Sequence, residues 1–219
     1  MLEYNGIKIK WFGHDSFLLE KNIKIVTDPY RISRKVDADL VLVSHEHFDH
    51  MSPDDLKKVV SGKTTIIAAR ECIPKLGDIS CKEKIAILPG EEKTVMGVKI
   101  KAVPAYNTTK INPETKRPFH PMEDRKVGFF IDMGGATVYH TGDSDNVPEM
   151  KNLQPDVLLV PVSGTYVMTA KDAAEAVASI KPKVAIPMHF GSIVGSVEDA
   201  KEFKNSVTQC QVHILSQET

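Results

Sequence analysis

Apolar and polar residues alternate with the two-residue period of β-strands over much of the first third of the chain. Residues 7–10 fit a half-buried strand, and residues 16–20 with 23–27 fit a hairpin. Residues 40–44 form a short apolar run, which is typical of a strand buried on both faces. Ser52, followed by proline and two aspartates, predicts the start of a helix, because these residues suit a helix N-terminus.

The rest of the chain continues with strands that later alternate with helices. Strands are expected at residues 65–68, 85–88, 98–103, 127–132, 136–140, 157–160 and 184–187. Helices are expected at residues 71–76, 170–180 and 197–203. Residues 104–126 have no period and contain several prolines, so they predict a long loop of the kind that carries function. Hairpins followed by strand–helix alternation indicate two sheets with helices outside, in one domain over residues 1–219.

Composition and charge exclude several classes of protein. The 28 basic and 29 acidic residues nearly cancel, and 42% of the chain is hydrophobic, which excludes disorder and a strongly basic nucleic-acid or membrane-surface protein. The odd number of cysteines without regular spacing (Cys72, Cys81 and Cys210) argues against a disulfide framework. With no stretch resembling a signal peptide or a membrane span, we expect a cytoplasmic protein without membrane partners.

A cluster of histidines follows the apolar run at 40–44. His45, His47 and His50 lie within six residues, although the whole chain has only eight histidines. Alternate residues of an extended chain point the same way, and Asp49 and His50 approach from the following turn. Imidazole and carboxylate are ligands for zinc and related metals, and ligands so closely spaced suit two neighbouring ions better than one. A solvated histidine-rich loop is the competing interpretation, which the adjoining buried strand makes the weaker one.

Two later residues are weak candidates when taken alone. Asp143 lies in a Gly-Asp turn after the expected strand at 136–140, where a plain turn aspartate is the ordinary interpretation. His189 follows the strand at 184–187 and fits a buried core histidine equally well. Together they gain weight, because residues at strand ends of an α/β architecture can converge on one edge of a sheet.

These motifs resemble those of the metallo-β-lactamase superfamily. The resemblance rests on His45-x-His47-x-Asp49-His50, Gly142-Asp143 and His189, in that order. Residues 11–17, 27–29, 139–143 and 187–190 resemble one branch, the small metal-dependent hydrolases related to ascorbate-6-phosphate lactonase. The resemblance covers nearly the whole chain. It implies an α/β fold, a four-layer αββα sandwich of two mixed β-sheets packed face to face with helices outside.

The resemblance also implies a set of site residues around two divalent metal ions. It assigns His45 and His47 to the first ion, Asp49, His50 and His189 to the second, and Asp143 to both. Asp28 is implied as an outer residue that orients the cluster. His14 and His140 fit similar outer positions or buried structural ones. Zn²⁺ is the expected metal, and Mn²⁺, Fe²⁺ and Ni²⁺ stay open because the sequence does not distinguish them.

The chain departs from the superfamily at one position. A third histidine usually reaches the first ion from a strand end in the middle of the chain, but Ala105-Tyr106-Asn107 stands there instead. His120, in the long loop, is the remaining histidine of that region. It either supplies the missing ligand or reaches the substrate, and an exposed loop histidine is an equal alternative. Tyr106 and Asn107 are candidate substrate contacts.

The implied chemistry is hydrolysis of an ester, lactone or phosphoester. Two metal ions lower the pKa of a bridging water, so that hydroxide exists near neutral pH, and Asp49 and Asp143 are the candidate catalytic residues. The loop at 104–126 carries five basic and three acidic residues, which fits a small anionic substrate, although solvated loop charges are the commoner explanation.

Other functions stay open or are disfavoured. A phosphodiesterase or nuclease of the same superfamily is one alternative, although the chain leaves no space for a large inserted domain and its charge disfavours nucleic acid. A di-iron redox protein would carry Glu at the position of His47 and an added flavin domain. A non-catalytic metal-binding protein is the last alternative. Homo-oligomer formation is left open.

Overall fold

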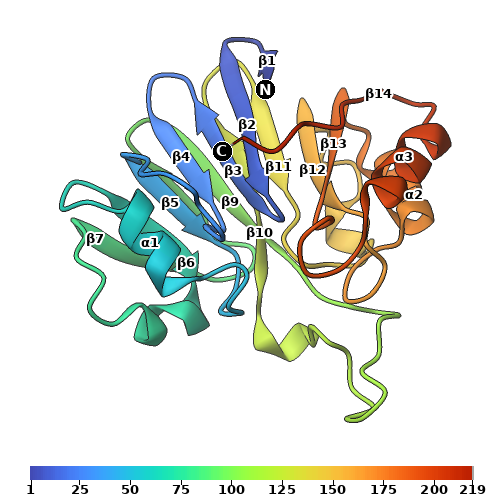
Figure 1. The fold of residues 1–219 in the computed structure, drawn as a ribbon, viewed down its shortest axis with the longest axis horizontal. Helices are drawn as coiled ribbons and strands as arrows, with labels where there is room; N and C mark the ends of the chain where they lie inside the picture. The colour runs from blue at the N-terminus through green and yellow to red at the C-terminus, as the bar shows by residue number, and fades with distance from the viewer. Residues whose placement is uncertain (219) are drawn as a thin grey trace. The chain divides into compact units, whose positions relative to one another are not determined.

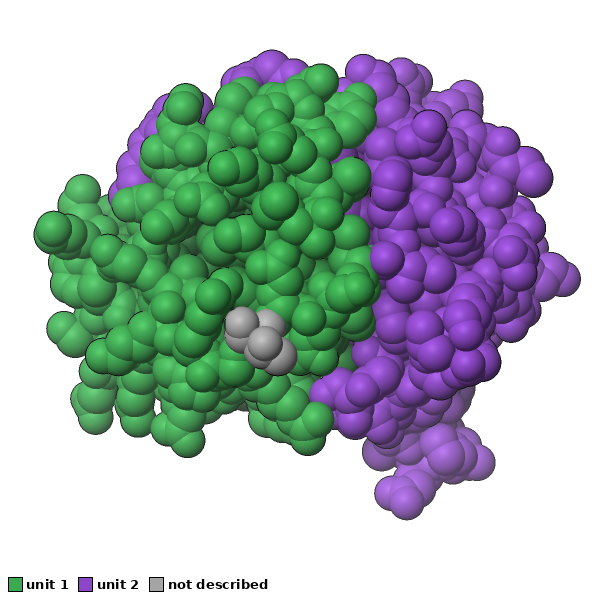
Figure 2. Space-filling view, turned by 45° about the horizontal axis from the view of Figure 1, so that its top comes forward, with its two compact units in different colours: residues 1–88, 215–219 green, residues 89–214 purple. Residues whose placement is uncertain are grey.

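The structure is a computed structural model that describes residues 1–218. Within these residues the strands form two mixed sheets of seven strands each (Figure 1). The chain divides into two compact units, coloured separately in Figure 2. Unit 1 holds residues 1–88 and the tail from residue 215, and unit 2 holds residues 89–214. Each unit contains one of the sheets, and the prediction of two mixed sheets with helices is confirmed.

The sheet of unit 1 is antiparallel at first and parallel afterwards. Its strands, in spatial as well as chain order, are β1 (Leu2–Tyr4), β2 (Ile7–Gly13), β3 (Ser16–Glu20), β4 (Lys24–Thr27), β5 (Leu40–Val43), β6 (Thr65–Ala69) and β7 (Glu83–Ile87). The strands from β4 to β7 are parallel, and every residue of β5 and β6 is buried. Helix α1 (Pro53–Val59) connects β5 to β6, and a 3₁₀ helix, η1 (Arg70–Leu76), follows β6.

The sheet of unit 2 has the same organisation. Its strands are β8 (Glu92–Val95), β9 (Val98–Pro104), β10 (Val127–Asp132), β11 (Thr137–His140), β12 (Val157–Pro161), β13 (Val184–Met188) and β14 (Gln211–Val212). The strands from β11 to β14 are parallel, so the chain leaves β11, β12 and β13 at the same edge. Helices α2 (Ala170–Ile180) and α3 (Val197–Ser206) pack against β12 and β13, and each begins with a capping box. Two short 3₁₀ helices are η2 (Met122–Asp124) and η3 (Pro148–Met150).

The long loop expected at 104–126 is more ordered than its sequence pattern indicates. It contains η2 and an isolated bridge between Ile111 and Pro118. Lys110 Nζ lies 2.8 Å from a carboxylate oxygen of Asp172, the third residue of α2 and the partner of Thr169 in its capping box. Unit 2 therefore holds this loop against the start of a helix. No helix in residues 1–218 combines the length and the apolar character that a membrane span requires.

Asp55 of α1 ties the connection after β4 to the helix. Its carboxylate accepts hydrogen bonds from the backbone N–H groups of Arg31, at 2.8 Å, and Ile32, at 2.9 Å. Lys58 Nζ also donates to it, at 2.9 Å. Burial raises the pKa of Asp55, but the hydrogen bonds from Lys58, Ser52 and the two backbone amides outweigh burial and hold the pKa below its usual value of 3.8.

We expect Asp55→Asn to lower the free energy of unfolding by about 1–2 kcal/mol at pH 7. Since the native pKa lies below the unfolded one, the carboxylate stabilises the native state fully above pH 3.8, and the effect is lost as the pH falls through the native value. Urea unfolding at pH 7 and pH 3 measures both effects, with Asp54→Asn on the exposed face of the same helix as the control. An undiminished difference at pH 3 contradicts this explanation.

Candidate metal centre

The ends of two adjacent parallel strands position the first polar cluster of unit 1. Asp28 directly follows β4 and Ser44 directly follows β5, so the sheet brings them side by side. One carboxylate oxygen of Asp28 accepts from the backbone N–H of Ser44 at 2.7 Å, and the other accepts from its hydroxyl at 2.6 Å. The second oxygen is also 3.0 Å from Nδ1 of His50. Asp28 and His50 are fully buried, so Asp28 fixes the orientation of that imidazole ring.

The neighbouring histidines of the motif lie in the same cluster. Nδ1 of His45 is 3.0 Å from the hydroxyl of Ser44, and Nε2 of His45 is 3.0 Å from Nδ1 of His47. The ring centroids of His45 and His50 are 4.0 Å apart. The three imidazoles of the motif therefore lie together in one place.

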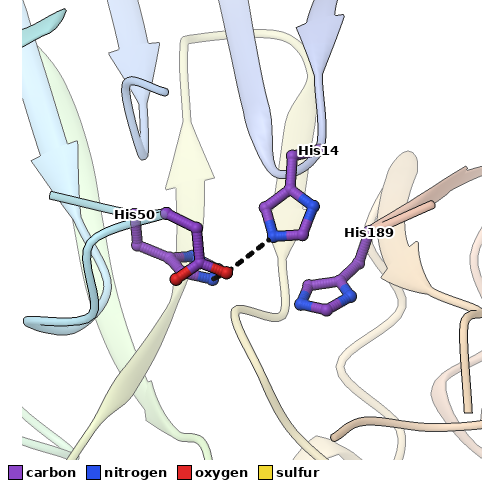
Figure 3. A group of neighbouring side chains, drawn as sticks. His14, His50 and His189 are labelled. Atoms are coloured by element: carbon purple, nitrogen blue, oxygen red, sulfur yellow. Dashed lines mark hydrogen bonds and ion pairs between the residues drawn. The ribbon is translucent and has the colours of Figure 1, made fainter. Parts of the chain in front are cut away.

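The turn between β2 and β3 adds His14, Asp15 and a contact to Asp49. Nε2 of His14 lies 3.0 Å from Oδ2 of Asp49 (dashed line in Figure 3). Its ring centroid is 5.4 Å from that of His50. The backbone of His14 has a φ of +51°, which is uncommon for a residue other than glycine, and Trp11 Nε1 donates to its carbonyl oxygen. Asp15, whose carboxylate lies 3.9 Å from Nδ1 of His50, is an acidic neighbour that sequence patterns do not single out.

Unit 2 gathers a second donor cluster beyond the carboxyl ends of its parallel strands. Asp143 follows β11 and His189 follows β13. Oδ2 of Asp143 is 3.3 Å from Nε2 of His189 and 3.3 Å from Nε2 of His120. All three side chains are buried. The expected convergence of Asp143 and His189 is present within this unit, and the loop histidine His120 joins them.

Each of these two histidines has its other ring nitrogen beside a polar side chain. Nδ1 of His189 is 2.9 Å from the hydroxyl of Ser163, which follows the neighbouring strand β12. Nδ1 of His120 is 3.0 Å from Oδ1 of Asn107, which also accepts from the backbone N–H of His120. Asn107 belongs to the segment 105–107, where the resemblance leads one to expect the superfamily's mid-chain histidine. An amide of this segment therefore lies beside a histidine of the loop.

The donor chemistry of both clusters fits divalent metal ions of the zinc type. Imidazole nitrogen and carboxylate oxygen are the donors that such ions bind, and metal-binding histidines are commonly oriented by a hydrogen bond at the second ring nitrogen. Ser44 and Asp28 do this for two rings of unit 1, and Asn107 and Ser163 for two rings of unit 2. Asp15, Asp28 and His50 additionally place donor atoms within 4.8 Å of one another.

Other expected site residues have different surroundings. His140 is buried, and its Nδ1 accepts from the backbone N–H of Gly142, which fixes the turn that leads to Asp143. The hydroxyl of Tyr106 donates to Glu149 at 3.1 Å. Burial and this hydrogen bond raise the pKa of Tyr106. Asn107 is buried rather than open to solvent, and its amide nitrogen donates to the carbonyl oxygen of Tyr166 at 3.0 Å.

Comparisons with known proteins agree with one another. The sequence profile described as "Beta-lactamase superfamily domain" matches residues 8–189. A UPF0173 metal-dependent hydrolase of Archaeoglobus fulgidus is 31% identical, over 92% of this chain and 90% of that protein. Another, of Pelotomaculum thermopropionicum, is 32% identical, over 96% of this chain and 97% of its own. A crystal structure from Parabacteroides distasonis, provisionally assigned as a metal-dependent hydrolase, superposes with a TM-score of 0.80 at 33% identity, covering 95% of this chain and 92% of that one.

Proposed function

This chain belongs to the β-lactamase superfamily and is a metal-dependent hydrolase, and on that premise we propose that its two donor clusters together hold two divalent metal ions, Zn²⁺ in the first place. We propose that the substrate is a small, anionic ester, lactone or phosphoester. We also propose that residues 1–219 form a single domain. A relationship to the ascorbate-6-phosphate lactonase branch is part of this proposal, because the motifs at 11–17 and 187–190 resemble that branch.

One observation carries the proposal. In each cluster, an imidazole ring has one nitrogen beside a polar side chain, and its other nitrogen faces a further side chain that could bind a metal ion. His120 and His189 illustrate this, because Asn107 and Ser163 lie at their Nδ1 atoms while both Nε2 atoms lie 3.3 Å from the same carboxylate oxygen of Asp143. A histidine that only fills a core has no need for such an arrangement, whereas a metal ligand does.

We assign the ligands as the superfamily pattern implies, with His120 in place of the mid-chain histidine that this chain lacks. His45, His47 and His120 would bind one ion, Asp49, His50 and His189 the other, and Asp143 both. Ser44 and Asp28 would keep the rings of unit 1 oriented, with His14 holding the carboxylate of Asp49. His140 would act on Asp143 only through the turn at Gly142.

The bound metal ions and Asp49 would have separate roles in hydrolysis. Bound metal ions would lower the pKa of a water molecule, so that hydroxide is available near neutral pH. The carboxylate of Asp49, which lies 3.0 Å from Nε2 of His14, would accept a proton from the attacking water and return it to the leaving oxygen. The side chain of Asp49 is partly exposed, as proton exchange with a substrate requires.

Charge on the long loop contributes less to substrate binding than its composition indicates. Lys110 pairs with Asp172, Arg117 with Glu123 and Lys126 with Asp124. Three of the five basic residues therefore have carboxylate partners already, so an anionic group of the substrate would rely mainly on the metal ions. Tyr106 stays a proposed substrate contact, while Asn107 would act on the substrate only through His120.

Assays of metal-loaded protein on two substrate panels test the proposal. We expect turnover of lactones and esters, loss of that turnover after dialysis against a chelator, and recovery with Zn²⁺. Turnover of phosphodiesters alone would instead support the phosphodiesterase alternative. A protein that binds the ions and turns over neither panel would be the non-catalytic metal-binding protein.

Location and assembly belong to the proposal as well. We propose a cytoplasmic location, because the odd number and irregular spacing of the cysteines fit reduced thiols. Fractionation of cells expressing the protein tests this expectation. Self-association into a homo-oligomer is tested by light scattering of the purified chain.

A further inference from the structure

An exposed phenylalanine lies inside the histidine motif of unit 1. Phe48 stands between His47 and Asp49 in the chain, and 66% of its side chain is open to solvent. Within residues 1–88 and 215–218, the terminal Met1 is the other large apolar side chain that is exposed. A single exposed apolar residue is ordinary on a protein surface, but this one is flanked on both sides by proposed metal ligands.

Backbone hydrogen bonds hold the turn that carries Phe48. The N–H groups of His50 and Met51 both donate to the carbonyl oxygen of His47, at 3.0 and 2.9 Å. The first of these bonds closes a turn with Phe48 and Asp49 as its two central residues. The fold therefore fixes the backbone of Phe48 and leaves its ring open to solvent.

Tyr30 continues the ring contacts from Phe48 towards the metal centre. The ring centroids of Tyr30 and Phe48 are 6.0 Å apart, with an angle of 80° between the rings, and those of Tyr30 and His14 are 5.7 Å apart, with an angle of 62°. Both pairs have the edge-to-face geometry that aromatic rings favour. His14 in turn lies beside Asp49 and the ring of His50 (Figure 3). A row of four rings therefore connects the exposed Phe48 with the buried His50.

Arg31 places a cation on the same tyrosine. Its guanidinium carbon lies over the ring of Tyr30, 5.3 Å from the centroid, and the residue is exposed. The backbone of Arg31 has a φ of +52°, which is uncommon for a residue other than glycine, and its N–H donates to Asp55. Backbone strain of this kind is frequent at ligand-binding sites. The cation is thus carried by a segment that the protein holds in a fixed conformation.

We propose that Phe48, Tyr30 and Arg31 form a subsite for an aromatic group that carries a negative charge. The exposed ring of Phe48 would contact the flat face of this group, and Arg31 would pair with its charge. Tyr30 contacts both residues and would keep them in place. Arg31 would then add a protein cation to the metal ions that attract an anionic substrate. The role of the subsite in catalysis rests on the proposed function, whereas binding of such an anion requires no hydrolysis.

Three acetate esters test the subsite by activity. Methyl acetate has no ring, phenyl acetate adds a ring, and 4-acetoxybenzoate adds a ring with a carboxylate. For Phe48→Ala we expect the loss of kcat/KM to be about 10-fold greater on the two aryl esters than on methyl acetate. For Arg31→Gln we expect a loss about 5-fold greater on 4-acetoxybenzoate than on phenyl acetate, and a smaller difference for Arg31→Lys. Each variant is compared with the wild type on the same ester, so differences in ester reactivity cancel.

Binding of 4-hydroxybenzoate tests the subsite without turnover. This anion is the product that hydrolysis of 4-acetoxybenzoate releases together with acetate. NMR of the zinc-loaded full chain with carbon-13-labelled phenylalanine should show the ring signal of Phe48 shifting during the titration, and Phe48→Leu identifies that signal. The Kd should rise about 10-fold in Phe48→Ala and about 5-fold in Arg31→Gln. Binding of phenol, which has no carboxylate, should not depend on Arg31.

Arg34→Gln and Met96→Ala are the matched controls. Arg34 is an exposed arginine of the same segment, and Met96 is an exposed apolar side chain in the turn between β8 and β9. We expect both variants to keep the wild-type preference among the three esters and the wild-type affinity for 4-hydroxybenzoate.

Other outcomes separate the subsite from the proposed function. A uniform loss on the three esters, with unchanged affinity for 4-hydroxybenzoate, overturns the proposal. So does a wild type that sediments as a dimer while Phe48→Ala sediments as a monomer of unchanged affinity, because a second copy of the chain then covers Phe48. If 4-hydroxybenzoate binds as expected and no ester is hydrolysed, the proposed ester hydrolysis fails and the subsite stands.

Discussion

Asp143→Ala is expected to remove hydrolytic activity and bound metal together. Oδ2 of Asp143 lies 3.3 Å from the Nε2 atoms of both His120 and His189, so it is the residue that joins the donors of unit 2. Loss of an outer partner of a metal ligand already costs about 10–100-fold in affinity or activity. Loss of this carboxylate should therefore cost at least about 100-fold in kcat/KM, and elemental analysis should find fewer metal ions per chain.

Asp132→Ala is a suitable control for this variant. Asp132 ends β10 in the same unit and accepts from the backbone N–H of Gly134 in a surface turn. We expect it to keep full metal content and turnover. If Asp143→Ala folds, binds two ions and turns over substrate normally, Asp143 is not a ligand, and the proposed centre is wrong.

Asp28→Ala is expected to have the largest effect on stability, about 3–5 kcal/mol in the free energy of unfolding. The substitution leaves the buried N–H of Ser44, its hydroxyl and Nδ1 of His50 without the carboxylate that lies 2.6–3.0 Å from them. It also frees the ring of His50 to rotate, so affinity for metal should fall as well. Urea unfolding of the metal-free protein isolates the effect on stability.

The opposite end of the same strand pair provides a control. Asp39, just before β5, accepts from the backbone N–H of Lys24 at 2.8 Å but is only partly buried. Asp39→Ala should cost at most about 1.5 kcal/mol, because solvent can replace the lost hydrogen bond. Equal losses from the two substitutions would show that Asp28 has no special structural role.

The regular elements could be predicted where local pattern and tertiary burial agree. Residues 127–132 and 170–180 are strand and helix as expected, because the first is a largely apolar segment before a Gly-Gly turn and the second has a side-chain cap and helix-favouring residues. The segment expected as a helix at 71–76 is instead the 3₁₀ helix η1, which contains Pro74 and ends at Gly77. Proline removes a backbone donor and disfavours a regular α-helix there.

Three strands carry no usable signal in the sequence. β8 is polar and largely open to solvent at the edge of its sheet, while β1 and β14 are only three and two residues long. Such short edge strands form because a neighbouring strand offers unpaired backbone groups, and this depends on the sheet rather than on the segment itself.

The candidate site shows the same division between local and distant information. The cluster from His45 to His50 could be identified from the sequence because its potential metal ligands lie close together along the chain. The partners that orient the later histidines could not be identified from the sequence. Ser163 contacts His189 only because β12 pairs with β13, and Asn107 contacts His120 only because of the way the loop folds. A polar residue at a strand end was the available signal, and it is too common to single out Ser163.

Anomalous X-ray scattering at the zinc edge, from crystals of the full chain grown with Zn²⁺, tests the metal centre most directly. We expect two neighbouring peaks, each about 2.0–2.1 Å from imidazole nitrogens of the assigned histidines and with Asp143 in contact with both. Zinc found only on surface residues, with His45, His50 and His189 unbound, would contradict the proposed centre.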